Sequence, residues 1–316
     1  MSDPQPTVSV VMSAYNAGLY LAEALESILK QTYGDFECIV IDDGSTDDTL
    51  AILRAYARRD DRLRVSSREN RGLIASLNEG IDLARGELIA RMDADDVALP
   101  RRLERQVDRL RQTGDVVALG TRIVLIDQAG RPLKRWNHRL VHEEIVARLL
   151  RGDGSALTHP TVMMRREAVM AVGGYDERFE AAEDFDLYLK LSEVGRLENL
   201  DEVLLYWRQH PASVNATRSE LWTSKKRLAL KEAMDRRGSS DFATALIPPQ
   251  EATIQEAGPE FWAASALGSG YHGTALHYSW RMIRDGSGRR AGLRMMSRIG
   301  RRKLGAMVSS FRKSAR

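Results

Sequence analysis

Short apolar runs alternate with amphipathic stretches through the first third of the chain. The apolar runs predict strands at 8–13, 36–41, 63–65, 87–91 and 115–120. The segments between them repeat apolar residues at helical spacing, as Leu21, Leu25 and Ile28 do, and predict helices at 17–31, 50–56, 74–84 and 101–112. Continuous apolar strands that alternate with amphipathic helices predict an α/β fold, in which helices cover both faces of a mostly parallel sheet.

Polar residues follow each of the first four predicted strands. The four loops read SAYNAG, DDGSTDD, RENRG and DADD. In a parallel sheet such loops share the edge formed by the carboxyl ends of the strands, where ligands bind. The sequence therefore predicts an acidic, polar ligand site at this edge.

The rest of the chain is irregular at first and then helical. Residues 121–140 are more irregular, with DQAGRP as a turn signal between extended segments, and AEDFDLYLKLSEVG (182–195) predicts a strong helix. From about residue 220 onward the pattern is helical. Because 316 residues exceed a typical domain of about 100–200 residues, we expect a main domain at 1–215 and a helical region at 216–316.

The composition indicates more about the cellular compartment of the protein than about its activity. Cys38 is the only cysteine, which excludes disulfides within the chain and cysteine-based zinc clusters, and favours a reducing compartment. No apolar run approaches the roughly 20 residues of a membrane span. The start, MSDPQPT, lacks the features of a signal peptide. These features predict a cytoplasmic protein.

The DADD loop places Asp93, Asp95 and Asp96 within four positions. Carboxylate oxygens are the ligands that Mg²⁺ prefers, often together with substrate phosphates. The alternative is a helix N-terminus, where one acidic residue is favoured before Pro100. Three acidic residues exceed that need, so we favour a site for a divalent cation and a diphosphate.

The DDGSTDD loop begins with Asp42 and Asp43 at the end of a predicted strand. Turn and helix-capping chemistry accounts for the residues from Gly44 onward. It explains the first two carboxylates less well, and a carboxylate there can accept hydrogen bonds from a base or a ribose. The glycine-rich signatures of dinucleotide sites and of P-loops are absent, so a nucleotide would be held by metal and side chains instead.

Seven ordered blocks carry a resemblance to a known family. They read VSVVMSAYN, VIDDGSTDDT, NRGLIASLNEGI, DADD, THPTVMMRR, GGYDERF and AEDFDLYLKL. Their order resembles that of family 2 glycosyltransferases with the GT-A fold, a Rossmann-like, mostly parallel sheet, over about 7–215. The resemblance implies an inverting enzyme that transfers a sugar from a nucleotide diphospho-sugar and uses Mg²⁺ or Mn²⁺.

The same resemblance implies contacts to the nucleotide. Ser13 and Tyr15 match the contacts of the first loop to the nucleoside. Asp43 matches the acid that reads the base. Asn70 and Arg71 stand where the family approaches the nucleotide.

Metal and catalytic roles are implied in the same way. Asp93 and Asp95 match the Asp-x-Asp motif, with Asp95 the more direct metal ligand, and Asp96 is expected to cap a helix or support the other two. Asp184 matches the general base, which would take the proton of the acceptor hydroxyl. Glu183 would orient the acceptor or simply favour the helix dipole.

Three further positions have open interpretations. Tyr175 could line the acceptor side or be an ordinary packed aromatic. Arg208 or His210 could close over the diphosphate, as comparable positions do in relatives. His159 is expected to be a structural hydrogen-bonding residue.

The end of the chain is strongly basic. From Arg281 to Arg316 there are twelve Lys and Arg residues against one acid. Apolar positions of a basic amphipathic helix follow Gly292; they are Leu293, Met296, Leu304, Met307 and Phe311. Such a helix can dock on an anionic membrane or pack on the protein with its basic face in solvent. No motif for nucleic acid accompanies the charge.

We expect a metal-dependent glycosyltransferase that uses a nucleotide-sugar, with a UDP-sugar favoured, and a saccharide or lipid-linked acceptor in bacterial surface polysaccharide or glycan synthesis. A peripheral position at the inner face of the plasma membrane is compatible with the basic tail. One rival is a sugar nucleotidyltransferase, which normally needs a glycine-rich basic loop that SAYNAG lacks. Another rival is an inactive scaffold that binds nucleotide-sugars, which the retention of both the Asp-x-Asp and the Glu-Asp disfavours.

Overall fold

The computed structural model describes residues 5–210, 219–238 and 258–314, apart from the side chains of 219–220 and 302–314. These residues belong to two compact units. The first unit comprises Met1–Ile123, Asn137–Trp207 and Thr217–Pro249, and the second comprises Val124–Trp136, Arg208–Ala216 and Gln250–Arg316. The boundary that we expected between 215 and 216 lies outside the described residues.

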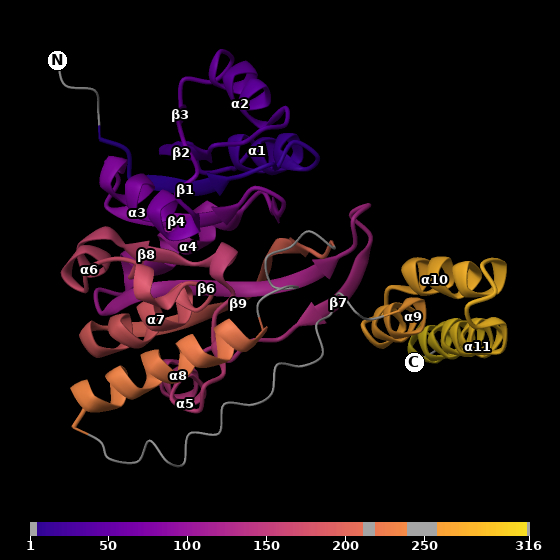
Figure 1. The fold of residues 1–316 in the computed structure, drawn as a ribbon. Coiled ribbons are helices and arrows are strands. Elements are labelled where there is room, and N and C mark those ends of the chain that lie inside the picture. The colour runs from indigo at the N-terminus through magenta and orange to yellow at the C-terminus, as the bar shows by residue number, and fades with distance from the viewer. Residues whose placement is uncertain (1–4, 211–218, 239–257, 315–316) are drawn as a thin grey trace. The chain divides into compact units, whose positions relative to one another are not determined.

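One mixed sheet runs through the described chain (Figure 1). Its strands are β1 (Val8–Ala14), β2 (Phe36–Asp43), β3 (Leu63–Arg68), β4 (Leu88–Asp93), β5 (Val97–Ala98), β6 (Val116–Ile126), β7 (Pro132–Trp136), β8 (Met163–Arg165) and β9 (Arg196–Arg208). The order is β3-β2-β1-β4-β8-β6-β9-β5, and β7 pairs with β6. The pairs β1–β2, β2–β3 and β1–β4 are parallel, whereas β8 pairs antiparallel with both β4 and β6.

The predicted α/β fold is confirmed, and the parallel part of the sheet matches the sequence pattern closely. Every residue of β2 is buried, as an apolar strand covered on both faces should be. The antiparallel strands were the less predictable part. The turn signal DQAGRP, expected between extended segments, joins the end of β6 to β7.

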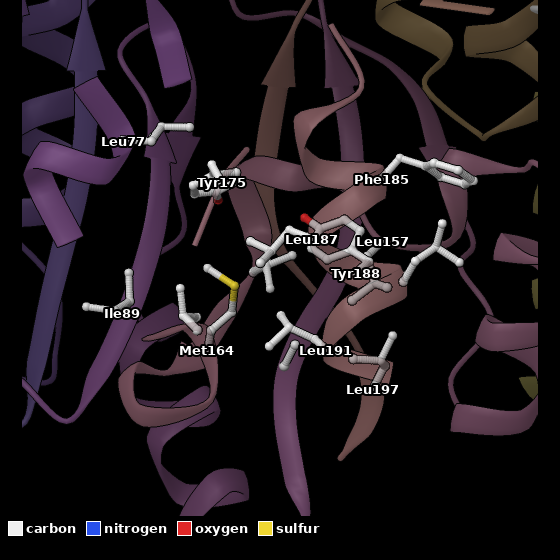
Figure 2. Packing of buried hydrophobic residues seen from close by; sticks show 14 of the residues in the cluster. Leu77, Ile89, Leu157, Met164, Tyr175, Phe185, Leu187, Tyr188, Leu191 and Leu197 are labelled. Atoms are coloured by element: carbon white, nitrogen blue, oxygen red, sulfur yellow. The ribbon is translucent and has the colours of Figure 1, made fainter. Parts of the chain in front are cut away.

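Helices of the first unit follow the strands. They are α1 (Leu21–Leu29), α2 (Thr49–Ala57), α3 (Leu73–Leu83), α4 (Arg102–Gln112), α5 (His142–Leu149), α6 (Arg166–Ala171), α7 (Glu183–Val194) and α8 (Ser219–Arg236). Figure 2 shows α7 contributing Phe185, Leu187, Tyr188 and Leu191 to one buried cluster with Tyr175. Because α7 is anchored so heavily, the residues at its first turn have a well-defined position.

Among its described residues, the second unit contains the end of β6, β7 and the helices α9 (Pro259–Gly268), α10 (His272–Arg284) and α11 (Arg289–Ser314). The basic helix α11 packs against α9 and α10, and it buries Met295 and Ile299. Leu293, expected on its apolar face, is 59% exposed. The side chains of Leu304, Met307 and Phe311 lie outside the described residues, so docking on a membrane stays a prediction.

Among the described helices, none combines the length and the apolar character that a membrane crossing requires.

Candidate functional site

The register of the parallel strands brings the polar loops to one edge of the sheet. Ser13, near the end of β1, is paired with Asp93 on β4 and with Ile41 on β2. Asp43, the last residue of β2, is paired with Arg68 on β3. Four strands therefore end side by side, and the loops that follow them meet at the predicted edge.

The first two loops are tied to each other by hydrogen bonds. The N–H of Asn16 donates to Ser45 Oγ at 3.0 Å, and the N–H of Thr46 donates to Asn16 Oδ1 at 2.8 Å. The N–H of Gly18 donates to Asp47 Oδ2 at 3.0 Å. These bonds explain much of the DDGSTDD motif as local structure. The side chain of Tyr15, in contrast, is 54% exposed beside this junction.

Asp43 holds the third loop. Its carboxylate is buried and accepts the N–H groups of Arg71 and Gly72, both at 2.9 Å, and it also pairs with Arg68. Asn70 and Arg71 are exposed at the tip of the same loop. The structure thus gives Asp43 a clear role in shaping the loop, and its predicted contact with a base remains a prediction.

The acidic motif forms a cluster in three dimensions. One carboxylate oxygen from each of Asp93, Asp95 and Asp96 lies within 4.8 Å of the others. Burial raises the pKa of Asp93, the charge of Asp95 raises it further, and the paired guanidinium of Arg91 opposes this. Three converging carboxylates fit a hard divalent cation, because such a cation prefers oxygen ligands and would relieve their mutual repulsion.

Glu183 and Asp184 open α7 close to this cluster. Asp184 Oδ1 accepts the N–H of Phe185 at 2.7 Å. Burial and then the charge of Asp184 raise the pKa of Glu183 to about 7, and burial raises the pKa of Asp184. The charges of Arg91 and Asp93 also act on Glu183. The acidic cluster and the Glu183–Asp184 pair therefore share one electrostatic environment at the edge of the sheet.

Tyr175 is a buried member of this environment. Its hydroxyl is 2.7 Å from His159 Nε2, and its backbone N–H and C=O both bond to the amide of Asn78. Burial lowers the pKa of His159 well below its ordinary value, so that ring is neutral. His159 is a hydrogen-bonding residue, as expected. Tyr175 is packed as a loop aromatic, and contact with an acceptor stays a prediction.

Arg208 and His210 belong to the second unit. The guanidinium of Arg208 is buried and donates to the carbonyl oxygen of Gln128 at 3.1 Å. His210 lines a cavity of about 400 Å³ together with Trp262 and Tyr278. The role expected of Arg208 and His210 in binding a diphosphate remains a prediction.

Two cations of the site were not predicted from the sequence. Arg91 lies in the apolar strand β4, and a charged residue at a buried strand position was the available signal. Lys226 lies in α8, and its charge lowers the pKa of Asp184. Nothing in the sequence around Lys226 distinguishes it from Lys225 and Lys231 of the same helix.

Comparisons with known proteins agree with this geometry. Residues 9–173 match the profile of the glycosyl transferase family 2. The putative glycosyltransferase EpsE of Bacillus subtilis is 39% identical over 209 residues, which are 65% of this chain and 73% of that protein. The O-antigen biosynthesis glycosyltransferase WbnJ of Escherichia coli is 32% identical over 246 residues, which are 76% of this chain and 93% of that protein.

Solved structures share the fold at lower sequence identity. TarS of S. aureus, in its complex with UDP-GlcNAc, aligns with a TM-score of 0.58 and 20% identity over 86% of this chain and 83% of that chain. The mannosyltransferase PcManGT of Pyrobaculum calidifontis, in complex with GDP-Man and Mn²⁺, aligns with a TM-score of 0.54 and 20% identity over 90% and 80%. With its GT-A fold and its acidic cluster at the sheet edge, the chain belongs to glycosyltransferase family 2.

Proposed function

We propose that this glycosyltransferase transfers a sugar from a nucleotide diphospho-sugar with inversion at the anomeric carbon. The observation that carries the proposal is the convergence of the Asp93–Asp95–Asp96 cluster with Glu183 and Asp184 in one environment. A cluster that can hold a cation, together with a partly buried carboxylate that can accept a proton, suits a reaction that needs both functions.

Asp93 and Asp95 would hold a divalent cation, which when bound neutralises the charge of the diphosphate leaving group. The complexes of PcManGT with GDP-Man and Mn²⁺ and of TarS with UDP-GlcNAc support a nucleotide-sugar donor and a cation of this kind. A UDP-sugar and Mg²⁺ or Mn²⁺ are our first choices. Ser13, Tyr15, Asp43, Asn70 and Arg71 would contact the nucleotide.

Asp184 would act as the general base. The acceptor oxygen forms a bond to the anomeric carbon, the bond from that carbon to the diphosphate oxygen breaks, and the hydroxyl proton passes to the Asp184 carboxylate. A base opposite the leaving group gives a single displacement, and hence inversion. A raised pKa suits the role, because a base is most effective when its pKa lies near the working pH. Glu183 would hydrogen-bond to the acceptor.

The acceptor is proposed to be a saccharide or a lipid-linked saccharide in the synthesis of a bacterial surface polysaccharide. The similarity to WbnJ, an O-antigen biosynthesis glycosyltransferase, supports this class of product. Tyr175 would border the acceptor through the loop that it anchors.

A panel of UDP, GDP, dTDP, CDP and ADP, each with Mn²⁺ and with chelator, tests the donor site by thermal shift. Ligand at about 100 times its dissociation constant adds about 2.7 kcal/mol to the stability of the folded state. We expect one nucleotide to raise the melting temperature only with Mn²⁺, and Asp95→Ala to remove this shift. An unchanged shift in Asp95→Ala would exclude Asp95 from the metal site.

Asp184→Asn tests the base. It should keep the thermal shift and lower the release of nucleoside diphosphate from the matching sugar donor by about 10²–10⁴-fold. Asp108→Asn, an exposed position on α4, is the control and should leave both measurements unchanged. Turnover near that of the wild type in Asp184→Asn would remove Asp184 from the mechanism.

A further inference from the structure

Lys226 is a buried cation enclosed by the first unit. Only 2% of the residue is exposed. Its Nζ atom donates to the carbonyl oxygen of Gly152 at 3.3 Å and lies 3.5 Å from the centre of the Trp222 ring and 4.8 Å from the centre of the Phe185 ring. A Cβ atom at Gly154 would lie 2.5 Å from Nζ, so the backbone also closes against it. Lysine is almost never fully buried without a partner.

One of the residues that enclose Lys226 directly follows the proposed base in the chain. Phe185, which supplies one of the two rings, directly follows Asp184 and donates its N–H to Asp184 Oδ1 at 2.7 Å. Helices α7 and α8, which carry the two charges, pack against each other. Burial raises the pKa of Asp184, and the charge of Lys226 is the largest opposing influence. Burial lowers the pKa of Lys226 to about 8, and Asp184 opposes that shift in turn.

Of the charged groups that raise the pKa of Lys226, Asp184 has the larger effect and Asp153 the smaller. Asp153 also faces Lys226, but it already pairs with Arg148 at 2.7 Å and accepts from the N–H and hydroxyl of Ser155. Other charged or titratable groups that act on Asp184, or on which it acts, include Arg91, Glu183, Tyr175 and Tyr188. The guanidinium of Arg91 already pairs with Asp93.

We propose that Lys226 is a positioning residue, whose buried ammonium group favours the charged form of the Asp184 carboxylate. The inference rests on the proposed role of Asp184 as the base. Lys226 acts through Asp184, because its own ammonium group is enclosed and cannot reach a substrate. Asp184 itself is only partly buried, whereas Lys226 is enclosed.

The first test is the pH dependence of Lys226→Met. The probe is UDP-GlcNAc with Mn²⁺ if the nucleotide panel selects UDP, or GDP-mannose if it selects GDP, with water as acceptor. Loss of the cation should raise the pKa of Asp184. The acidic limb of the pH profile of kcat/KM should therefore shift to higher pH by about one unit or more, while the alkaline limb keeps its position. Lys226→Arg should restore the limb, and Lys225→Met on the same helix is the control. An acidic limb at the wild-type position in Lys226→Met would overturn the proposal.

The second test needs no turnover. Melting temperatures are compared at pH 7 for the wild type, Lys226→Met, Asp184→Asn and the double variant. If the two charges interact, Lys226→Met lowers the melting temperature more in the presence of Asp184 than in the Asp184→Asn background. The shift of the double variant then departs from the sum of the two single shifts by about 2 °C or more. Additive shifts would overturn the proposal. An inactive wild type would contradict the proposed function alone, and this cycle would still decide the role of Lys226.

Discussion

A buried polar bridge beneath the acidic motif offers a sharp test of how this fold is held together. Gln106, on α4, is completely buried. Its Nε2 atom donates to the carbonyl oxygens of Leu119 at 2.7 Å and Thr161 at 2.8 Å, and its Oε1 atom accepts from Arg102 Nε at 3.2 Å. Arg102 in turn donates to the carbonyl oxygen of Arg91 at 2.6 Å. The Gln106 amide therefore links α4 to two other segments, and through Arg102 it supports a bond to the strand that carries Asp93.

Gln106→Met keeps the length of the side chain and removes all three of these bonds. Two carbonyl oxygens and one guanidinium N–H then lose a partner, and each buried group left without one costs about 1–3 kcal/mol. Burial already lowers the pKa of Arg102 to about 9, because it disfavours the charged guanidinium. Loss of the hydrogen bond to Gln106 would destabilise this buried cation further. Taking the lower figure for each group, we expect a loss of about 3 kcal/mol in the free energy of unfolding. That is a large part of the roughly 5–15 kcal/mol that stabilises a typical protein.

Urea unfolding followed by circular dichroism and by tryptophan fluorescence measures this loss. The midpoint should fall while the dependence on urea stays the same, because the surface exposed on unfolding hardly changes. Gln112→Met, at the exposed last residue of α4, is the matched control and should shift stability by no more than about 0.5 kcal/mol. A loss below about 1 kcal/mol in Gln106→Met would refute the reasoning that these bonds are buried and unreplaced.

Two further predictions concern a buried carboxylate and a strained residue. Burial alone would raise the pKa of Glu37, but bonds from the Arg85 N–H, the Ser9 hydroxyl and Arg64 lower it below its ordinary value. The ionised Glu37 carboxylate therefore stabilises the folded protein above about pH 4.3, the pKa of a Glu in the unfolded chain. This stabilisation is lost as the pH falls through the lower pKa that Glu37 has in the folded protein. Glu37→Gln should flatten this acid dependence in urea unfolding between pH 3 and 7, and an unchanged dependence would contradict the assignment. Ala181, just before the proposed base, has a φ of 72°, so Ala181→Gly should raise stability by up to about 1 kcal/mol; a lower melting temperature than the wild type would argue against strain there.

The alternating pattern alone determined the parallel half of this protein. Apolar runs predicted β1, β2 and β4, because a parallel strand buried on both faces must be apolar along its whole length. Polar residues after those strands predicted a site at their carboxyl edge, because the strands of a parallel sheet all end on the same side. The order of the seven motifs along the chain was sufficient to identify the family, because it is a property of the sequence alone.

The tertiary structure decided what those residues do to one another. Asp43 could be read from the sequence as a ligand-binding acid, but only the fold shows it holding the backbone of Arg71 and Gly72. Lys226 follows Asp184 by more than forty positions and resembles any helical lysine until α8 packs on α7. Burial and the proximity of charges depend on contacts between segments far apart in the chain. Local patterns carry no record of such contacts, and the electrostatics of the site therefore emerges only in the folded molecule.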